Sequence, residues 1–274
     1  MNNSAIKWLL CFFPLFFLAG CDDDNDVPIV IPQTETFVLV HGAFQGAYVW
    51  QYVKDQLVKN GQKVVVVELP AHGGDNTAPA ATSINVYRDK VISSITPAMG
   101  KVVLVGHSLG GMVISAVAEK IPDQIGKLVY LTAFVPANGQ SLLDLASTDS
   151  TSLLGAALIP SKDQLTLDVK PENIAPIFVQ DGSDIVKKVL LDNKKVEPAI
   201  PFGDKVALTA ANFGKVKKYY IHTTKDMALG YNLQKRMVAS GGIKNVYSLD
   251  TGHSPFLSKP DALTEILMKI IAAN

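Results

Sequence analysis

The sequence predicts an α/β fold in which a mostly parallel sheet is flanked by helices. From residue 37 to about 134, short apolar segments of strand length alternate with segments of helical spacing, which is typical of parallel strands joined by right-handed crossovers. The strand segments, such as Val102-Val103-Leu104-Val105, are almost continuously apolar, which indicates a sheet covered on both faces. A glycine-flanked serine, Gly106-His107-Ser108-Leu109-Gly110, stands between one such strand and the next helix.

The elements follow one another in a regular order. We expect strands over 37–40, 64–67, 102–105 and 127–131, and helices over 48–60, 84–95 and 112–120. The alternation stops at Pro136, and residues up to about 205 carry amphipathic pieces at 141–145, 152–158 and 181–191. We interpret 136–205 as a helical cap insertion. Strands are predicted again over 218–223 and 245–249, before a final helix over 261–272.

The N-terminus has the features of an export signal. Lys7 precedes an apolar stretch that is too short to span a bilayer comfortably. This stretch ends in Leu18-Ala19-Gly20-Cys21, which resembles the lipobox of bacterial lipoproteins. The resemblance implies a signal peptide over 1–20, a lipid on Cys21 and attachment to a membrane outside the cytoplasm, on the periplasmic or the cell-surface side. An ordinary secretory signal with an incidental cysteine and a plain membrane anchor are the alternatives.

A polar tether follows Cys21. Asp22-Asp23-Asp24-Asn25-Asp26 cannot form a core, and the proline-containing stretch up to residue 36 is typical of a linker, so we expect the folded domain to occupy 37–274. The chain has 25 basic and 25 acidic residues, and this balance gives no indication of nucleic-acid binding. Because the only cysteines are Cys11 and Cys21, the domain can hold neither a disulfide nor a cysteine-ligated metal. The sequence gives no oligomeric state.

The serine at position 108 has the local context of a nucleophile. A sharp turn between strand and helix exposes the hydroxyl, and small residues at Gly106 and Gly110 avoid collisions there. The helix that begins just after Ser108 directs free N–H groups and the positive end of its dipole toward the reaction centre. A glycine-rich turn without chemistry is the alternative for this motif.

A serine needs a base and an acid, and both are expected in loops that follow later strands. His253 is the only histidine after the last predicted strand, and Asp226 follows the strand over 218–223. The chain order serine, acid, histidine matches the order found with this type of turn. Asp250 is a competing acid, but it lies too close to His253 in sequence to face it easily. We expect the other histidines to be structural.

The negative oxygen of a tetrahedral intermediate needs two convergent N–H donors. One is expected from the backbone of Leu109. The other is expected from the glycine-rich turn after the first strand, with Ala43 as the first candidate and Phe44 as the second.

With these residues in place, the stretch 37–273 resembles the α/β-hydrolase superfamily. The turn His41-Gly42-Ala43-Phe44-Gln45-Gly46-Ala47-Tyr48-Val49-Trp50 is similar to that of the methylesterase and hydroxynitrile-lyase group and of related bacterial carboxylesterases. The segments Glu68 to Gly73 and Ala133 to Pro136 fall where that group has its landmarks. The lyases of the group carry a threonine at the position of Gly42 and a lysine at that of Ser254, so the resemblance implies ester hydrolysis.

The expected activity is therefore hydrolysis of carboxylic esters of small hydrophobic compounds through an acyl-enzyme, without a metal or cofactor. Ser108, Asp226 and His253 are the expected catalytic residues, and Phe44 and Phe134 are expected to contact substrate. Leu142, Leu153 and Phe178 are further candidates for an apolar wall, although each could simply be core. Two alternatives stay open. One is different chemistry on the same residues, such as acyl transfer, lactone or amide opening or C–C hydrolysis, and the other is a non-catalytic ligand-binding protein.

Overall fold

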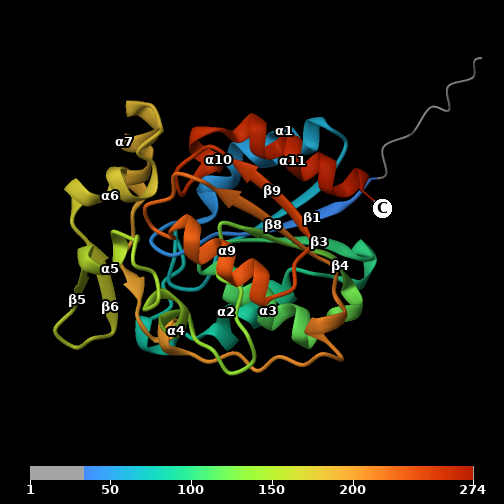
Figure 1. Ribbon diagram of the computed structural model, residues 1–274, viewed down its shortest axis with the longest axis horizontal. Coiled ribbons are helices and arrows are strands. Elements are labelled where there is room, and N and C mark those ends of the chain that lie inside the picture. Colours follow the sequence, from blue (N-terminus) through green and yellow to red (C-terminus); the bar gives the residue numbers. More distant parts are fainter. Residues whose placement is uncertain (1–33, 274) are drawn as a thin grey trace, which may run out of the picture. The chain divides into compact units, whose positions relative to one another are not determined.

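A six-stranded parallel sheet forms the centre of the computed structural model, which describes residues 34–273. Its strand order is β2-β1-β3-β4-β8-β9, with all neighbouring strands parallel. The strands are β1 (Thr36–Val40), β2 (Lys63–Val67), β3 (Val102–His107), β4 (Ile125–Leu131), β8 (Lys218–Thr223) and β9 (Asn245–Leu249). The predicted parallel sheet is confirmed (Figure 1).

Helices cover both faces of this sheet. One face packs against α1 (Gln51–Lys59), α10 (Pro255–Ser258) and α11 (Pro260–Ala272), and the other against α2 (Ile84–Ser93), α3 (Gly110–Lys120) and α9 (Tyr231–Ser240) (Figure 1). Side chains of a strand alternate between the two cores: Phe37 and Leu39 join the first, Val38 and Val40 the second. Burial on both faces explains why the strands are continuously apolar.

The predicted and observed elements differ mainly at their ends and in α9. The stretch predicted as one helix over 48–60 begins with a short 3-10 helix, Ala47–Trp50, before α1. Helix α2 begins at Ile84, where the Ser83 hydroxyl accepts a hydrogen bond from the Val86 N–H. Helix α9 had not been predicted, because its charged and polar residues dilute the apolar repeat of Leu233 and Met237.

The cap contains strands as well as helices. Its elements are α4 (Leu142–Ala146), α5 (Leu154–Ala157), β5 (Leu158–Pro160), β6 (Thr166–Val169), α6 (Pro171–Phe178), α7 (Asp184–Asn193), β7 (Glu197–Pro198) and α8 (Ile200–Gly203). The strands form an antiparallel sheet in the order β5-β6-β7, which the prediction of a helical insertion did not include. Strands of two to four residues are too short to show the alternation that identifies a strand in sequence.

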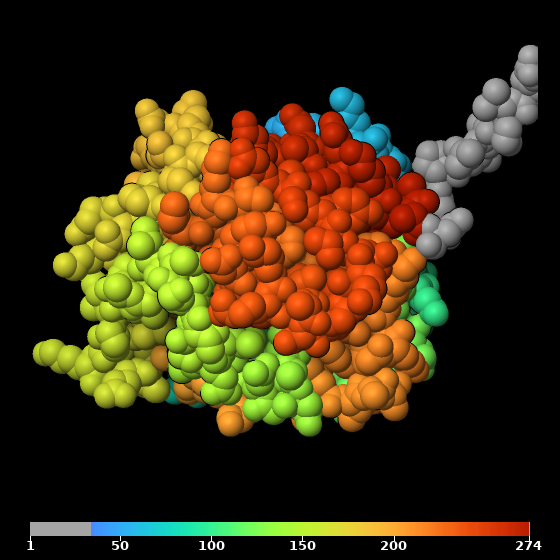
Figure 2. All heavy atoms as spheres, viewed as in Figure 1, coloured from blue at the N-terminus to red at the C-terminus, as the bar shows by residue number. Residues whose placement is uncertain are grey.

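The cap is fastened to the loop that follows β8. The N–H of Leu153 donates to the carbonyl of Met227 at 2.8 Å, and the hydroxyl of Ser152 donates to that of Ala228 at 2.7 Å. The carboxylate of Asp149 accepts the N–H of Gly230 at 2.7 Å. In Figure 2 the yellow-green atoms of the cap accordingly lie against the orange atoms of the C-terminal half.

The predicted signal peptide, the lipid site at Cys21 and the tether up to residue 33 lie outside the described residues. Within residues 34–273 no helix has the length and apolar character needed to cross a bilayer.

Candidate active site

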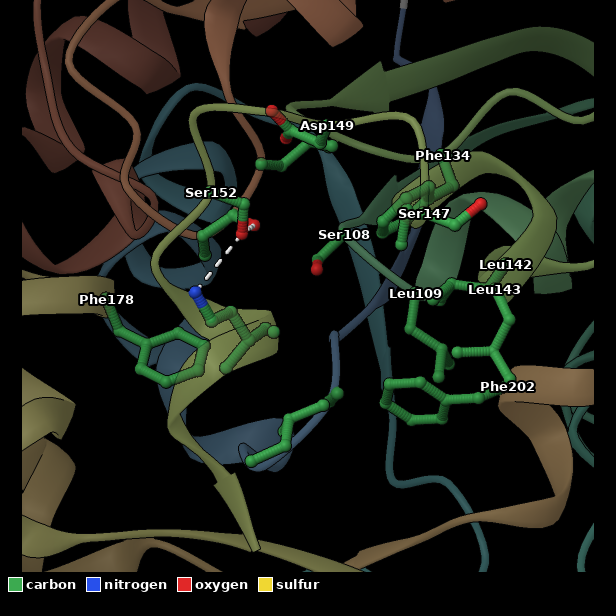
Figure 3. A pocket seen from close by; sticks show the side chains of 17 residues that line it. Ser108, Leu109, Phe134, Leu142, Leu143, Ser147, Asp149, Ser152, Phe178 and Phe202 are labelled. Carbon is green, nitrogen blue, oxygen red and sulfur yellow. Dashed lines mark hydrogen bonds between the residues drawn. The ribbon is translucent and has the colours of Figure 1, made fainter.

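Ser108 occupies a strained turn between β3 and α3. Its φ of +53° lies in the left-handed region that non-glycine residues rarely adopt. The neighbouring glycines are required by close packing: a Cβ on Gly106 would lie 2.6 Å from the carbonyl oxygen of Gly110, and a Cβ on Gly110 would lie 2.9 Å from that of His41. The turn presents the Ser108 side chain to a cavity (Figure 3).

His253 and Asp226 form a buried pair. Nδ1 of His253 lies 2.7 Å from Oδ2 of Asp226, and their side chains are 2% and 0% exposed. Because an ionised carboxylate only accepts hydrogen bonds, Nδ1 carries the proton and Nε2 is left as an acceptor. The structure thus brings together the two residues that the sequence placed in loops after β8 and β9.

Asp226 is held by its surroundings on both oxygens. Oδ2 also accepts the hydroxyls of Thr132, at 2.6 Å, and Thr223, at 2.9 Å. Oδ1 accepts the backbone N–H groups of Ala228 and Leu229 at 2.7 and 2.8 Å. These four donors fix the orientation of the carboxylate.

The loop that carries His253 is tied to the serine turn. Nε2 of His107 donates to the carbonyl of His253 at 2.9 Å, and the two imidazole rings lie 4.5 Å apart. Burial sets the pKa of His107 well below its usual value, so this ring is a neutral donor. The next residue, Ser254, accepts a hydrogen bond from the side-chain amide of Gln45 at 3.0 Å.

The competing acid, Asp250, points elsewhere. Its carboxylate accepts the Thr224 hydroxyl at 2.9 Å and the Lys225 ammonium at 2.7 Å, and its side chain is 72% exposed. Asp226 is therefore the acid that contacts His253.

Two backbone N–H groups beside Ser108 are available to a ligand. The N–H groups of Ala43 and Leu109 donate to no other group among residues 34–273, and both residues line the cavity together with Ser108. The N–H of Phe44, by contrast, donates to the carboxylate of Glu197 at 2.6 Å. Of the two candidates in the turn after β1, only Ala43 has a free donor.

The cavity over Ser108 measures about 390 Å³ and is mainly apolar. Its wall comes from the serine turn, the cap and the loop after β8 (Figure 3). The lining residues are Ala43, Ser108, Leu109, Phe134, Leu142, Leu143, Ala146, Ser147, Asp149, Ser152, Leu154, Gly155, Leu158, Phe178, Phe202, Ala228 and Leu229. Asp149 is the only ionisable side chain among these described wall residues.

Only some of the residues predicted to contact substrate line the cavity. Phe134, Leu142 and Phe178 line the cavity. Phe44 is buried behind the wall, with its ring 5.8 Å from that of Phe178, and Leu153 is half exposed on the outside of the cap.

The remaining histidines have structural partners. Nδ1 of His41 donates to the carbonyl of Gly42 and its Nε2 accepts the N–H of Leu69, while burial lowers its pKa. His222 contacts the side chain of Gln234 at 3.1 Å. His72 donates to the carbonyl of Pro70, as expected for a residue that stabilises its loop, but it also contacts Glu197.

Sequence reasoning missed the residues that support the site. Thr132 and Glu197 have no local signal, because their partners lie far away along the chain. Thr223 lies only three residues before Asp226, but no local motif marks it as a supporting residue. A threonine at the end of a strand, beside the sheet edge where loops converge, was the one available indication. Within residues 34–273 no cluster of three His, Cys, Asp or Glu side chains could hold a metal ion.

A doubly covered parallel sheet, a left-handed serine at the end of its third strand and a buried aspartate–histidine pair together define a protein of the α/β-hydrolase class. Comparison with known families agrees: residues 37–266 match the model of the "Alpha/beta hydrolase family". The chain belongs to this family, and within it to a methylesterase-like group.

The relatives of Arabidopsis thaliana place it in that group. "Putative methylesterase 11, chloroplastic" is 33% identical over 87% of this chain and 64% of its own length. "Methylesterase 9" is 31% identical over 85% of this chain and 97% of its own length. The chain thus spans less than two thirds of the first of these relatives. A crystal structure of polyneuridine aldehyde esterase has a TM-score of 0.75 at 25% identity, and the match covers 87% of this chain and 99% of that one.

Proposed function

We propose that this protein is a serine-dependent carboxylesterase that acts on small, neutral, hydrophobic esters. The observation that carries the proposal is the convergence, at one apolar cavity, of left-handed Ser108 and the turn of Ala43, with the His253–Asp226 pair held against the same serine turn. The names of the relatives support ester hydrolysis as the reaction class.

The proposed reaction begins when Nε2 of His253 takes the proton of Ser108 while Oγ attacks the ester carbonyl. The Ala43 and Leu109 N–H groups stabilise the resulting oxyanion. His253 then protonates the leaving alcohol, and an acyl group remains on Ser108. Water attacks this acyl group with His253 again as base, which releases the acid and restores the serine. Asp226 orients the ring and stabilises its charged form.

The cavity wall supports the choice of substrate. Apolar side chains from α4, α5, α6 and α8 face the serine, so an alkyl or aryl group replaces water favourably there. A volume of about 390 Å³ suits a small molecule rather than a polymer. The proposed steps need neither a metal nor a cofactor.

The geometry also bears on lyase chemistry. A Cβ on Gly42 would lie 2.7 Å from Cβ of Ser108 and 2.7 Å from Nδ1 of His107, so a threonine there would require a shift of the turn. Ser254, at the position of the lysine in the lyases, is engaged with Gln45. Both observations favour hydrolysis over cleavage of a cyanohydrin.

The test compares the full-length protein, solubilised in detergent, with a Ser108→Ala variant on short-chain p-nitrophenyl esters. We expect turnover by the wild type and a loss of about 10⁴-fold or more in the variant. Equal rates would refute the mechanism. Product analysis on lactones, amides and alcohol acceptors separates ester hydrolysis from the other triad reactions, and absence of Ser108 labelling by a fluorophosphonate would favour a binding protein.

For the N-terminus we propose export as a lipoprotein, with cleavage before Cys21 and a lipid on its thiol. The sequence Leu18-Ala19-Gly20-Cys21 after an apolar segment supports this. In a bacterial host the wild type should be recovered from the membrane fraction, with a lipid-shifted N-terminal mass. A Cys21→Ser variant should lack that mass, and an unmodified mature wild type would contradict the proposal.

A further inference from the structure

Glu197 of the cap is buried against the turn that carries Ala43. Its side chain is 0% exposed, and its Oε2 accepts the N–H of Phe44 at 2.6 Å. The same oxygen lies 2.9 Å from Nε2 of His72, in the loop after β2. One cap carboxylate thus joins two loops of the sheet that are separated from it by 153 and 125 residues.

Phe44 is clamped by the cap on both of its backbone groups. Its N–H donates to Glu197, and its carbonyl accepts the N–H of Lys195 at 3.3 Å. Its φ of +61° lies in the left-handed region that non-glycine residues rarely adopt. The contacts with 195–197 hold the residue in this conformation.

His72 is the second partner of the same carboxylate oxygen. Since Nδ1 donates to the carbonyl of Pro70, Nε2 can donate to Glu197 only when the ring is protonated, and otherwise accepts from a protonated Glu197. Either way one proton joins the pair, which is the condition for placing a carboxylate in the interior. The rings of His41 and Tyr87 pack against that of His72, and the charge of Glu68 also acts on it.

From this geometry we propose that Glu197 is a positioning residue for the oxyanion donor of Ala43. The inference rests on the proposed esterase function and deepens it. Ala43 directly precedes the clamped residue, and its N–H is free beside Ser108. By fixing Phe44 in the left-handed region, Glu197 sets the direction of the preceding peptide. The cap therefore both encloses the substrate and shapes the hole that stabilises the transition state.

A positioning role predicts a specific kinetic signature. The donor of Ala43 gains its full strength only when the oxyanion forms, so its misplacement should lower kcat and leave KM nearly unchanged. A displacement of about 1 Å can cost about 100-fold. We expect Glu197→Ala to lower kcat about 10- to 100-fold.

A matched control separates this effect from loosening of the cap. Lys194 lies three residues from Glu197, and its ammonium contacts Asp168 and the carbonyl of Val169, both in β6. Lys194→Ala therefore removes a cap contact that does not touch the turn of Ala43. We expect this variant to keep its kcat within about threefold of the wild type.

A pair of conservative variants tests the hydrogen bonds themselves. In Glu197→Gln a single amide oxygen cannot satisfy both the Phe44 N–H and an unprotonated His72, so kcat should fall about tenfold. Adding His72→Gln supplies an N–H donor at the place of Nε2. The double variant should then recover to within about threefold of the wild type. This comparison applies even if Glu197→Ala does not fold.

The experiment measures kcat and KM of the full-length variants on a p-nitrophenyl ester, together with inhibition by a matched trifluoromethyl ketone, which binds as an oxyanion. We expect ketone affinity and kcat/KM to fall in parallel in Glu197→Ala. An unchanged kcat, a loss equal to that of Lys194→Ala, or no recovery in the double variant would overturn the proposal. An inactive wild type would instead refute the esterase function, so the two failures are distinguishable.

Discussion

Oδ2 of Asp226 accepts Nδ1–H of His253 at 2.7 Å while it also accepts the hydroxyls of Thr132 and Thr223. The carboxylate is therefore fixed before any substrate arrives, and it leaves His253 one tautomer. In that tautomer Nε2 of His253 carries no proton, so it can accept the proton of Ser108 as the proposed mechanism requires.

Asp226→Asn should disrupt this arrangement with little change in shape. Thr132, Thr223 and the two N–H groups all donate to the carboxylate, so the amide is poorly accommodated and the Nδ1–H tautomer loses its acceptor. We expect kcat on an ester to fall about 10³- to 10⁴-fold. Asp250→Asn is the control and should retain its activity, because Asp250 faces Lys225. A similar loss of kcat in both variants would show that the assignment of Asp226 as the acid is wrong.

The packing behind the serine turn gives a prediction about stability. A Cβ on Gly111 would lie 2.2 Å from the carbonyl oxygen of Phe134 and 2.9 Å from Cβ of Ala133, both rigidly held. Gly111→Ala should therefore lower the free energy of unfolding by about 1–3 kcal/mol. Gly74→Ala is a suitable comparison, since nothing lies within 4 Å of a Cβ there. The free energies of unfolding of the two variants can be measured by denaturant titration, and equal values would contradict the packing argument.

Charge in the cavity wall should select among substrates. Asp149 is the one ionisable side chain among the described wall residues, so an acyl group that ends in a carboxylate meets repulsion and loses water. We expect kcat/KM for a neutral butyrate ester to exceed that for a succinate half-ester by about 10- to 30-fold. Asp149→Asn should narrow this ratio. A preference for the anionic ester would show that the substrate enters by another surface.

The His72–Glu197 pair should make stability depend on pH. Burial acts to lower the pKa of His72, but the charge of Glu197 and the hydrogen bond to it outweigh burial and raise this pKa above its ordinary value of 6.5. A folded-state pKa above the unfolded one stabilises the protein fully below about pH 6.5, and this contribution is lost as the pH rises through the folded value.

The measurement is the difference in Tm between the wild type and His72→Gln, from about pH 6 to about pH 9. The difference should be largest at the acidic end and should shrink as the pH rises. A difference that stays constant or grows with pH would contradict a raised pKa.

The sheet was predictable from the sequence because its strands are buried on both faces. β8 and β9 were predicted with their observed bounds, since 218–223 and 245–249 are short β-rich runs between polar loops. Ser108, Asp226 and His253 could also be selected as candidates, because the carboxyl ends of parallel strands meet at one edge and chain order restricts the choice. These inferences used only local patterns and topology.

The supporting contacts could not be predicted in this way. Glu197 lies between Val196 and Pro198 in a segment with no periodicity. Its partners, Phe44 and His72, come close to it only when the chain is folded. The same contact occupies the N–H of Phe44, so that Ala43 is left as the available oxyanion donor in this turn. Strands β5 to β7 are similarly defined by pairing across the cap and not by their own composition.

The proposed mechanism requires Ser108 to form a covalent acyl intermediate. The most direct test is intact-mass and peptide analysis of the full-length protein quenched early in turnover of a p-nitrophenyl ester, when the acyl-enzyme accumulates. We predict a mass increase equal to the acyl group on the peptide that contains Ser108, and no increase in Ser108→Ala. An acyl group on another residue, or hydrolysis by Ser108→Ala at the wild-type rate, would contradict it.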